Sequence, residues 1–243
     1  MKCGTTALWR NLSLHPDIHM GKNPDDPKTT STEIRFWNNG GPHRTWRNGI
    51  DWYKGLFDYS KVCGEKCANY IESPKAISRM REHIPDLKLV LCVRQPTDRM
   101  LSEFWMHHTK PDKIAKFSGF AAESGPRMRS LYLKQLKRSV LLNYNISQIY
   151  VVIQERMAAD TLGEINKLCN WLGLSPFNAK VAPVDFDKRD DDVAGLRVWE
   201  TDHKVDMSSY MRKYLNDYFR PQNERFFDWL GHSIPEWDEG YAL

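Results

Sequence analysis

Two short apolar runs constrain the fold of this chain more than any other feature. LKLVLCV (87–93) and QIYVVI (148–153) are rich in β-forming residues, and a helical pattern follows each of them. Runs that are apolar at nearly every position are typical of strands buried on both faces of a parallel sheet. Strands that alternate with helices predict an α/β domain, with a central parallel sheet between layers of helices. In such sheets, ligands bind at the carboxyl ends of the strands.

Helical patterns surround the two runs. The expected helices share a periodic apolar face, and they cover residues 5–14, 73–84, 97–108, 124–144 and about 162–172. Thr97 is placed to cap the third of these, and Gly173 to end the last as its C′ residue. The segment from Ser124 to Tyr144 is expected to form one long helix.

The charge balance limits the partners. Lys and Arg number 35 against 31 Asp and Glu, and the formal net charge of +4 suits an anionic small ligand better than nucleic acid. No apolar run reaches the roughly 18 residues of a membrane span. No Pro/Gly/Ser-rich linker divides the chain, so we expect residues 1–243 to form a single domain without nucleic-acid partners or a membrane span.

The five cysteines argue against a disulfide framework and against a metal centre. They are odd in number and scattered along the chain. Cys63 and Cys67 are four residues apart, yet no second pair at a zinc-like spacing accompanies them. We therefore expect buried thiols and no metal.

The chain begins with a stretch that suits an anion. Lys2-Cys3-Gly4-Thr5-Thr6 offers an ammonium group, a glycine that allows close backbone approach, and two hydroxyls at a helix start. Helix N-termini attract anions through their N–H groups and the macrodipole, so this segment is a candidate phosphate loop. It differs from the Walker pattern because its lysine precedes the glycine, and taken alone it also fits an ordinary helix start.

A second constellation follows the run at 87–93. Arg94 stands at the end of this expected strand, and Ser102 lies eight residues later on the next helix. A guanidinium and a hydroxyl facing one crevice suit a second phosphate. The alternative is that Arg94 pairs with a nearby acid and that Ser102 is a solvated helix residue.

Together, four ordered motifs resemble the sulfotransferase family. They are KCGTT at 2–6, TEIRFW at 32–37, GEKCANY at 64–70 and VRQPTDRMLS at 93–102. The resemblance is closest to the carbohydrate branch that modifies heparan-type glycans with 3′-phosphoadenosine 5′-phosphosulfate (PAPS). It implies a P-loop-like three-layer α/β/α domain that transfers sulfate from PAPS to a hydroxyl or amine of a carbohydrate, without a metal.

The resemblance also implies roles for individual residues. Those that would bind PAPS are Lys2, Cys3, Gly4, Thr5 and Thr6 at the 5′-phosphosulfate, Arg94 and Ser102 at the 3′-phosphate, and Lys204 on a closing loop. Glu33 would be the catalytic base, and Lys66 would lie near the reaction centre. Lys2 would also offset charge on the leaving phosphate.

The chain departs from the family pattern beside the expected base. Thr32 precedes Glu33 where glycan enzymes often carry lysine, and Arg35 stands where they often carry histidine. Such a cation could pair with Glu33 or favour an acidic acceptor. The region of Lys204 lacks the cysteine that often ties the family's closing loop.

The start of the chain poses a further question. Phosphate loops usually follow a strand, but this one begins one residue after Met1. We therefore expect a sheet that lacks its first strand or borrows a substitute, as in a domain truncated at its phosphosulfate-binding loop.

Two other hypotheses of function stay open: a sulfotransferase-like binding module without turnover, and a nucleotide kinase that needs magnesium. The compartment is also open between the cytoplasm, for a bacterial protein, and the Golgi lumen, for an animal enzyme that has lost its anchor.

Overall fold

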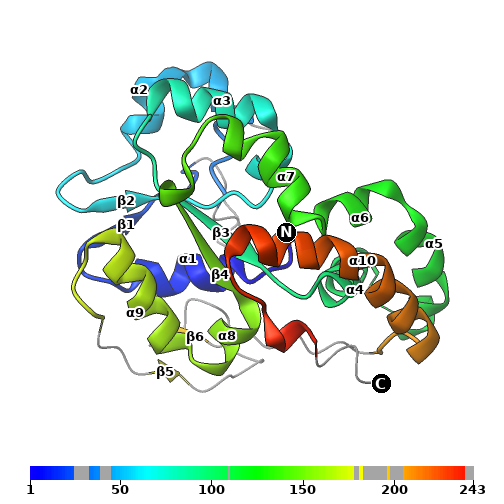
Figure 1. Ribbon diagram of the computed structural model, residues 1–243. Coiled ribbons are helices and arrows are strands. Elements are labelled where there is room, and N and C mark those ends of the chain that lie inside the picture. The colour runs from blue at the N-terminus through cyan, green and yellow to red at the C-terminus, as the bar shows by residue number, and fades with distance from the viewer. Residues whose placement is uncertain are drawn as a thin grey trace.

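The computed structural model describes residues 1–24, 33–38, 45–108, 110–177, 181–182, 196–197 and 205–238 (Figure 1). Its α-helices are α1 (Thr5–Ser13), α2 (Gly49–Lys54), α3 (Pro74–His83), α4 (Pro96–His107), α5 (Phe117–Ala122), α6 (Ser124–Arg129), α7 (Tyr132–Arg138), α8 (Gln154–Ala159), α9 (Thr161–Leu172) and α10 (Ser209–Leu230). Short 3-10 helices are η1 (Thr45–Asn48), η2 (Tyr70–Glu72), η3 (Pro111–Lys116), η4 (Val140–Leu142), η5 (Ile146–Gln148) and η6 (Pro235–Trp237).

The described strands pair two by two, always in parallel. The pairs are β1 (Ile18–Met20) with β2 (Val62–Gly64), β3 (Leu89–Val93) with β4 (Ile149–Ile153), and β5 (Val181–Ala182) with β6 (Leu196–Arg197). Parallel strands joined through helices confirm the predicted α/β class. Residues 1–4 form no strand, and among the described strands none joins the β1–β2 pair to the β3–β4 pair.

Helices cover both faces of the β3–β4 pair. Val152 of β4 packs in one cluster with Leu8 of α1 and Leu168 of α9. Its neighbour Ile153 packs in another cluster, which contains residues of α3, α7 and α10, Leu136 among them. Successive residues of a strand point to opposite faces, so the pair is a layer between two helical layers. Figure 1 shows β3 and β4 passing through the middle of the molecule.

The expected long helix at 124–144 is wrong, because the chain there forms α6, α7 and η4 instead. The first break falls at Leu131, whose ψ of 75° is not helical, and the second at Ser139. At each break, a serine side chain forms a hydrogen bond with a distant segment. Ser130 Oγ accepts a hydrogen bond from Arg99 Nε at 2.6 Å, and Ser139 Oγ donates to the carbonyl of Ile71 at 3.1 Å.

The cap of α4 also differs from the prediction. Gln95 caps this helix, since its Oε1 accepts the N–H of Asp98 at 2.8 Å. The Thr97 hydroxyl instead donates to Asn216 Oδ1 of α10 at 2.6 Å, and Gln95 Nε2 donates to the same oxygen at 3.0 Å. These bonds attach the loop after β3 to α10. The predicted helix end at Gly173 is confirmed, with φ of 84° at that residue.

Candidate active site

The candidate phosphate loop leads into α1, as the sequence predicts. Lys2 has φ of 66° and Gly4 has φ of 75°, so the backbone turns through the left-handed region before the helix begins. A Cβ atom at Gly4 would overlap the side-chain oxygen of Gln154, which follows β4. No side-chain hydrogen bond caps α1 in the described part of the chain, so its first N–H groups are available to an anion.

Lys66 joins two motifs that lie far apart in the sequence. Its Nζ donates to Thr6 Oγ1 at 3.0 Å and lies 3.6 Å from Glu33 Oε1. The side chains of Lys66 and Glu33 are only 11% and 15% exposed, so little water screens this pair. The structure therefore brings the candidate base, the candidate phosphate loop and Lys66 into one site.

The Glu33 carboxylate is surrounded by donors. The N–H of Ala68 donates to Oε1 at 3.1 Å, and Arg35 Nε donates to Oε2 at 3.1 Å. Arg35 thus pairs with Glu33, which was one of its two expected roles. These contacts fix the position of both carboxylate oxygens.

The residues that alternate with Glu33 and Arg35 hold this segment in place. Ile34 and Phe36 are fully buried, and the Phe36 ring stacks on Tyr53 with centroids 4.6 Å apart. Thr45 Oγ1 donates to the carbonyl of Ile34 at 3.3 Å. The apolar anchors leave the two charged side chains on the side of Lys66.

Burial changes the proton affinity of both lysines. Burial lowers the pKa of Lys2, and the charge of Arg94 lowers it further, while Glu103 acts in the opposite direction. Burial also lowers the pKa of Lys66, and Glu33 partly offsets this effect. Lys2 and Arg94 lie close enough to repel one another, so an anion between them would stabilise both charges.

Tyr132 of α7 connects the phosphate loop to the end of β3. Its hydroxyl donates to the carbonyl of Arg94 at 2.6 Å and accepts the N–H of the same residue at 3.2 Å. Cys3 Sγ lies 3.6 Å from this hydroxyl. Ser102 on α4 is only 3% exposed, so it is not the solvated residue of the alternative interpretation. Sequence reasoning missed Tyr132 because it lies within the segment interpreted as one continuous helix.

Glu65 is a second carboxyl group that sequence reasoning missed. The Tyr53 hydroxyl donates to its Oε1 at 2.8 Å, and the Tyr70 hydroxyl donates to its Oε2 at 3.2 Å. Burial raises the pKa of Glu65 to about 7, against the opposing effect of these hydroxyl donors. Its place directly before Lys66 in the GEKCANY motif was the available signal.

Thr32 and Lys204, which the sequence analysis names, lie outside the described residues. In the described ranges, no group of three or more His, Cys, Asp or Glu side chains could hold a metal ion. None of the described helices is both long and apolar enough to cross a membrane.

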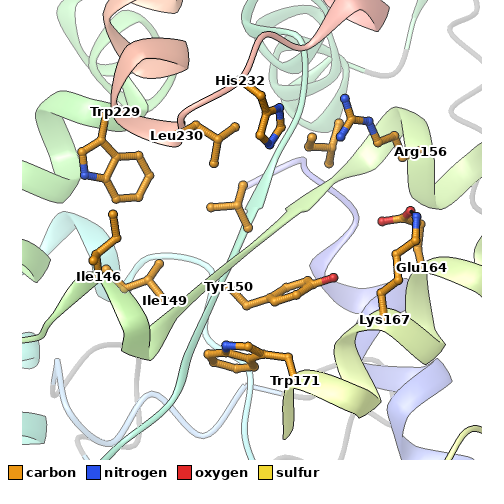
Figure 2. A pocket seen from close by; sticks show the side chains of 12 residues that line it. Ile146, Ile149, Tyr150, Arg156, Glu164, Lys167, Trp171, Trp229, Leu230 and His232 are labelled. Carbon is orange, nitrogen blue, oxygen red and sulfur yellow. Dashed lines mark hydrogen bonds and ion pairs between the residues drawn. The ribbon is translucent and has the colours of Figure 1, made fainter.

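A cavity of about 430 Å³ lies along β4 (Figure 2). It runs along β4 between α9 and the end of α10, and Tyr150, Trp171 and Trp229 line it together with nine other residues. Its cations are paired with acids, Arg156 with Glu236 at 2.7 Å and Lys167 with Glu164 at 2.6 Å. No sequence-predicted site residue lines this cavity, so we place the candidate site at Lys66 and the start of α1.

The fold defines a P-loop-like α/β protein, with a candidate anion site at the start of α1 and Lys66 bonded to Thr6 beside it. The sulfotransferase domain family matches residues 1–228, and the chain belongs to this family.

Two relatives are heparan sulfate enzymes by name. The chain is 27% identical over 267 residues to the human bifunctional heparan sulfate N-deacetylase/N-sulfotransferase 3, covering 97% of this chain and 30% of that protein. It is 28% identical over 186 residues to the mouse heparan sulfate glucosamine 3-O-sulfotransferase 6, covering 71% of this chain and 50% of that protein. The matches therefore span half or less of these relatives.

A solved structure shares the fold. The sulfotransferase from Alicyclobacillus acidocaldarius aligns with a TM-score of 0.66 at 23% identity, over 97% of this chain and 94% of that one.

Proposed function

We propose that this chain transfers a sulfuryl group from PAPS to a hydroxyl or amine of a carbohydrate acceptor, and that residues 1–243 act as a single sulfotransferase domain. The observation that carries the proposal is the position of Lys66, bonded to Thr6 and 3.6 Å from Glu33. This ammonium group links an anion site to a carboxylate base. Family membership supports the reaction class, and the names of the relatives support the acceptor class.

The residues present fit both anionic ends of PAPS. The uncapped N–H groups of α1 and the Lys2 ammonium suit the 5′-phosphosulfate. Arg94 and Ser102 suit the 3′-phosphate, because a guanidinium and a hydroxyl both donate hydrogen bonds to phosphate oxygens. The mutual repulsion of Lys2 and Arg94 supports a ligand that carries negative charge near both.

The chemistry follows from the same positions. Glu33 takes the proton of the acceptor while the acceptor oxygen or nitrogen attacks sulfur, and the bond from sulfur to the 5′-phosphate oxygen breaks. Adenosine 3′,5′-bisphosphate leaves with the bonding electron pair, and Lys2 offsets the charge that develops on it. Lys66 orients the sulfuryl group between Thr6 and Glu33. The chain itself supplies the positive charge, so we propose no metal for this step.

A transfer assay tests the proposal. The protein is incubated with radiolabelled PAPS and a panel of uronate–glucosamine oligosaccharides, and label is expected in at least one saccharide. Transfer to none of them would contradict the proposed function. If adenosine 3′,5′-bisphosphate still raised the melting temperature, the chain would be a binding module, and magnesium-dependent ATP hydrolysis would instead indicate a kinase-like or NTPase activity.

A further inference from the structure

Three exposed tyrosines form a continuous face on α10. Tyr210, Tyr214 and Tyr218 are 80%, 46% and 38% exposed, and four-residue steps place them on one side of the helix, about 6 Å apart along its axis. Other aromatic residues of this helix, such as Phe219 and Phe226, are fully buried. The three tyrosines, called the tyrosine face below, therefore point away from the core that this helix covers.

A cation is fixed against the tyrosine face. Arg127 comes from α6, which lies beside α10 (Figure 1). Its Nη2 donates to the Tyr214 hydroxyl at 3.4 Å, and its guanidinium carbon lies 4.7 Å from the centroid of the Tyr218 ring. Its Nε donates to the carbonyl of Ala121 at 2.6 Å, which holds the group in place. Over the described ranges, no carboxylate lies within ion-pair distance of Arg127.

The surrounding charges favour an anionic ligand. Asp217 directly precedes Tyr218, and it pairs with Lys213 at 2.9 Å and with Arg220 at 3.1 Å. Its charge is thus more than balanced by its two partners. Together with Arg127, the two partners of Asp217 place three cations and one carboxylate beside the exposed rings.

We propose that the tyrosine face and Arg127 bind an anionic saccharide chain, at a surface that shares no residue with the candidate active site. Exposed aromatic rings offer flat apolar area to the C–H faces of sugar rings, and a fixed guanidinium pairs with carboxylate or sulfate groups. The saccharide class rests on the proposed function, because the acceptor proposed there is a carbohydrate. A single fixed guanidinium and a net charge of +4 favour a saccharide over nucleic acid.

Direct binding tests this surface without any turnover. A fluorescent octasaccharide of alternating glucuronate and N-sulfoglucosamine is titrated against the protein in the absence of PAPS. Replacing both Tyr210→Ala and Tyr214→Ala is expected to weaken binding about tenfold, because two ring contacts are lost. The double Tyr→Phe variant keeps the rings and is expected to bind within about twofold of the unmodified protein. Arg127→Gln is expected to weaken binding and to reduce its salt dependence.

Two controls separate this inference from the proposed function. Tyr59→Ala removes a ring that is 66% exposed elsewhere on the surface, and it is expected to leave octasaccharide binding unchanged. Adenosine 3′,5′-bisphosphate is expected to bind all variants equally, since none of them alters the candidate active site. A protein that binds the octasaccharide at the tyrosine face but transfers no sulfate would overturn only the proposed function.

Three results would overturn the inference itself. The first is equal octasaccharide affinity in the double alanine variant and the unmodified protein. The second is no octasaccharide binding by the unmodified protein. The third is tighter binding of a single-stranded DNA oligonucleotide of equal charge, lost in the double alanine variant, which would assign the surface to nucleic acid.

Discussion

At the scale of single residues, Lys66 is the side chain that connects the parts of the site. A lysine ammonium has three N–H donors. One of them donates to Thr6, and the group also faces Glu33 at 3.6 Å. A donor is left for an oxygen of a bound sulfuryl group. The burial that lowers the pKa of Lys66 also strengthens its attraction for such an anion, because less water screens the charge.

Arg94 is proposed to bind the 3′-phosphate of the nucleotide. Arg94→Ala is expected to weaken binding of adenosine 3′,5′-bisphosphate by about 10- to 100-fold, because hydrogen bonds to a charged group contribute roughly 1.5–3 kcal/mol. Isothermal titration calorimetry measures the affinity. Adenosine 5′-monophosphate, which lacks the 3′-phosphate, is the matched control ligand, and the substitution should weaken its binding only slightly. Equal losses for the two nucleotides would show that Arg94 does not contact the 3′-phosphate.

The charged residues of the candidate site are easier to predict from the sequence than the residues that contact and position them. Lys2, Glu33 and Lys66 occur in short motifs whose residue types suggest anion and proton chemistry. The structure places Lys66 3.6 Å from Glu33 and 3.0 Å from Thr6, which belongs to the same loop as Lys2. Tyr132 could not be assigned, because its role depends on a contact with a segment distant in the sequence. The raised pKa of Glu65 could not be predicted either, because it results from burial in the folded protein. Tyr132 reaches Arg94, which is 38 residues away.

At the scale of elements, the start of α1 determines where the proposed anion site lies. Gly4 takes a φ of 75° there and packs against Gln154, so the loop lies directly on the end of β4. A side chain at this position meets a conformational penalty, and the end of the Gln154 side chain must move to make room for it.

Gly4→Ala is therefore expected to lower the free energy of unfolding by about 1–3 kcal/mol and to weaken binding of adenosine 3′,5′-bisphosphate. Chemical denaturation measures the first effect and calorimetry the second. Gly119→Ala is the matched control, because a Cβ at this position in α5 has no atom within 4 Å. Helix propensity predicts that the control is stabilised by about 0.5–1 kcal/mol. Equal stability of Gly4→Ala and the unmodified protein would contradict the strain at Gly4.

The elements themselves were predictable to different degrees. The strands at 87–93 and 148–153 were identified because buried parallel strands consist of continuous apolar residues. The helix expected at 124–144 failed because hydrogen bonds from Arg99 and to Ile71 outweigh local helix propensity at Ser130 and Ser139. Tyr132, which bonds to Arg94, directly follows the first break.

At the scale of the whole molecule, the β1–β2 pair and the β3–β4 pair are connected through side chains near the site. Lys66 follows β2 and reaches the loop that starts α1, while Tyr132 attaches the same loop to the end of β3. The site therefore depends on the global fold. Conditions that destabilise the fold should also disturb the site.

Glu65 makes this stability depend on pH. Its pKa is raised from 4.5 to about 7 in the folded protein, so the folded state holds the proton more tightly than the unfolded state. The stabilising contribution is complete below about pH 4.5 and is lost as the pH rises through about 7. The shift corresponds to roughly 3 kcal/mol at most.

Glu65→Gln is expected to remove the pH dependence of stability. The glutamine keeps an oxygen that can accept hydrogen bonds from the hydroxyls of Tyr53 and Tyr70. Urea denaturation at pH values from 5 to 8 is expected to show the unmodified protein losing stability relative to the variant, by up to about 3 kcal/mol. The exposed Glu224→Gln variant is the control and should show no such trend. Parallel curves for Glu65→Gln and the unmodified protein would exclude a buried, protonated Glu65.

The most direct test of the central claim is the rate of sulfuryl transfer in Glu33→Gln, measured together with its affinity for adenosine 3′,5′-bisphosphate. Glutamine keeps the size of the side chain but cannot take the acceptor proton. The proposed mechanism predicts a rate lower by about 10²–10⁴-fold, with nucleotide affinity unchanged within about twofold. A variant that transfers sulfate at the rate of the unmodified protein would contradict the assignment of Glu33 as the base.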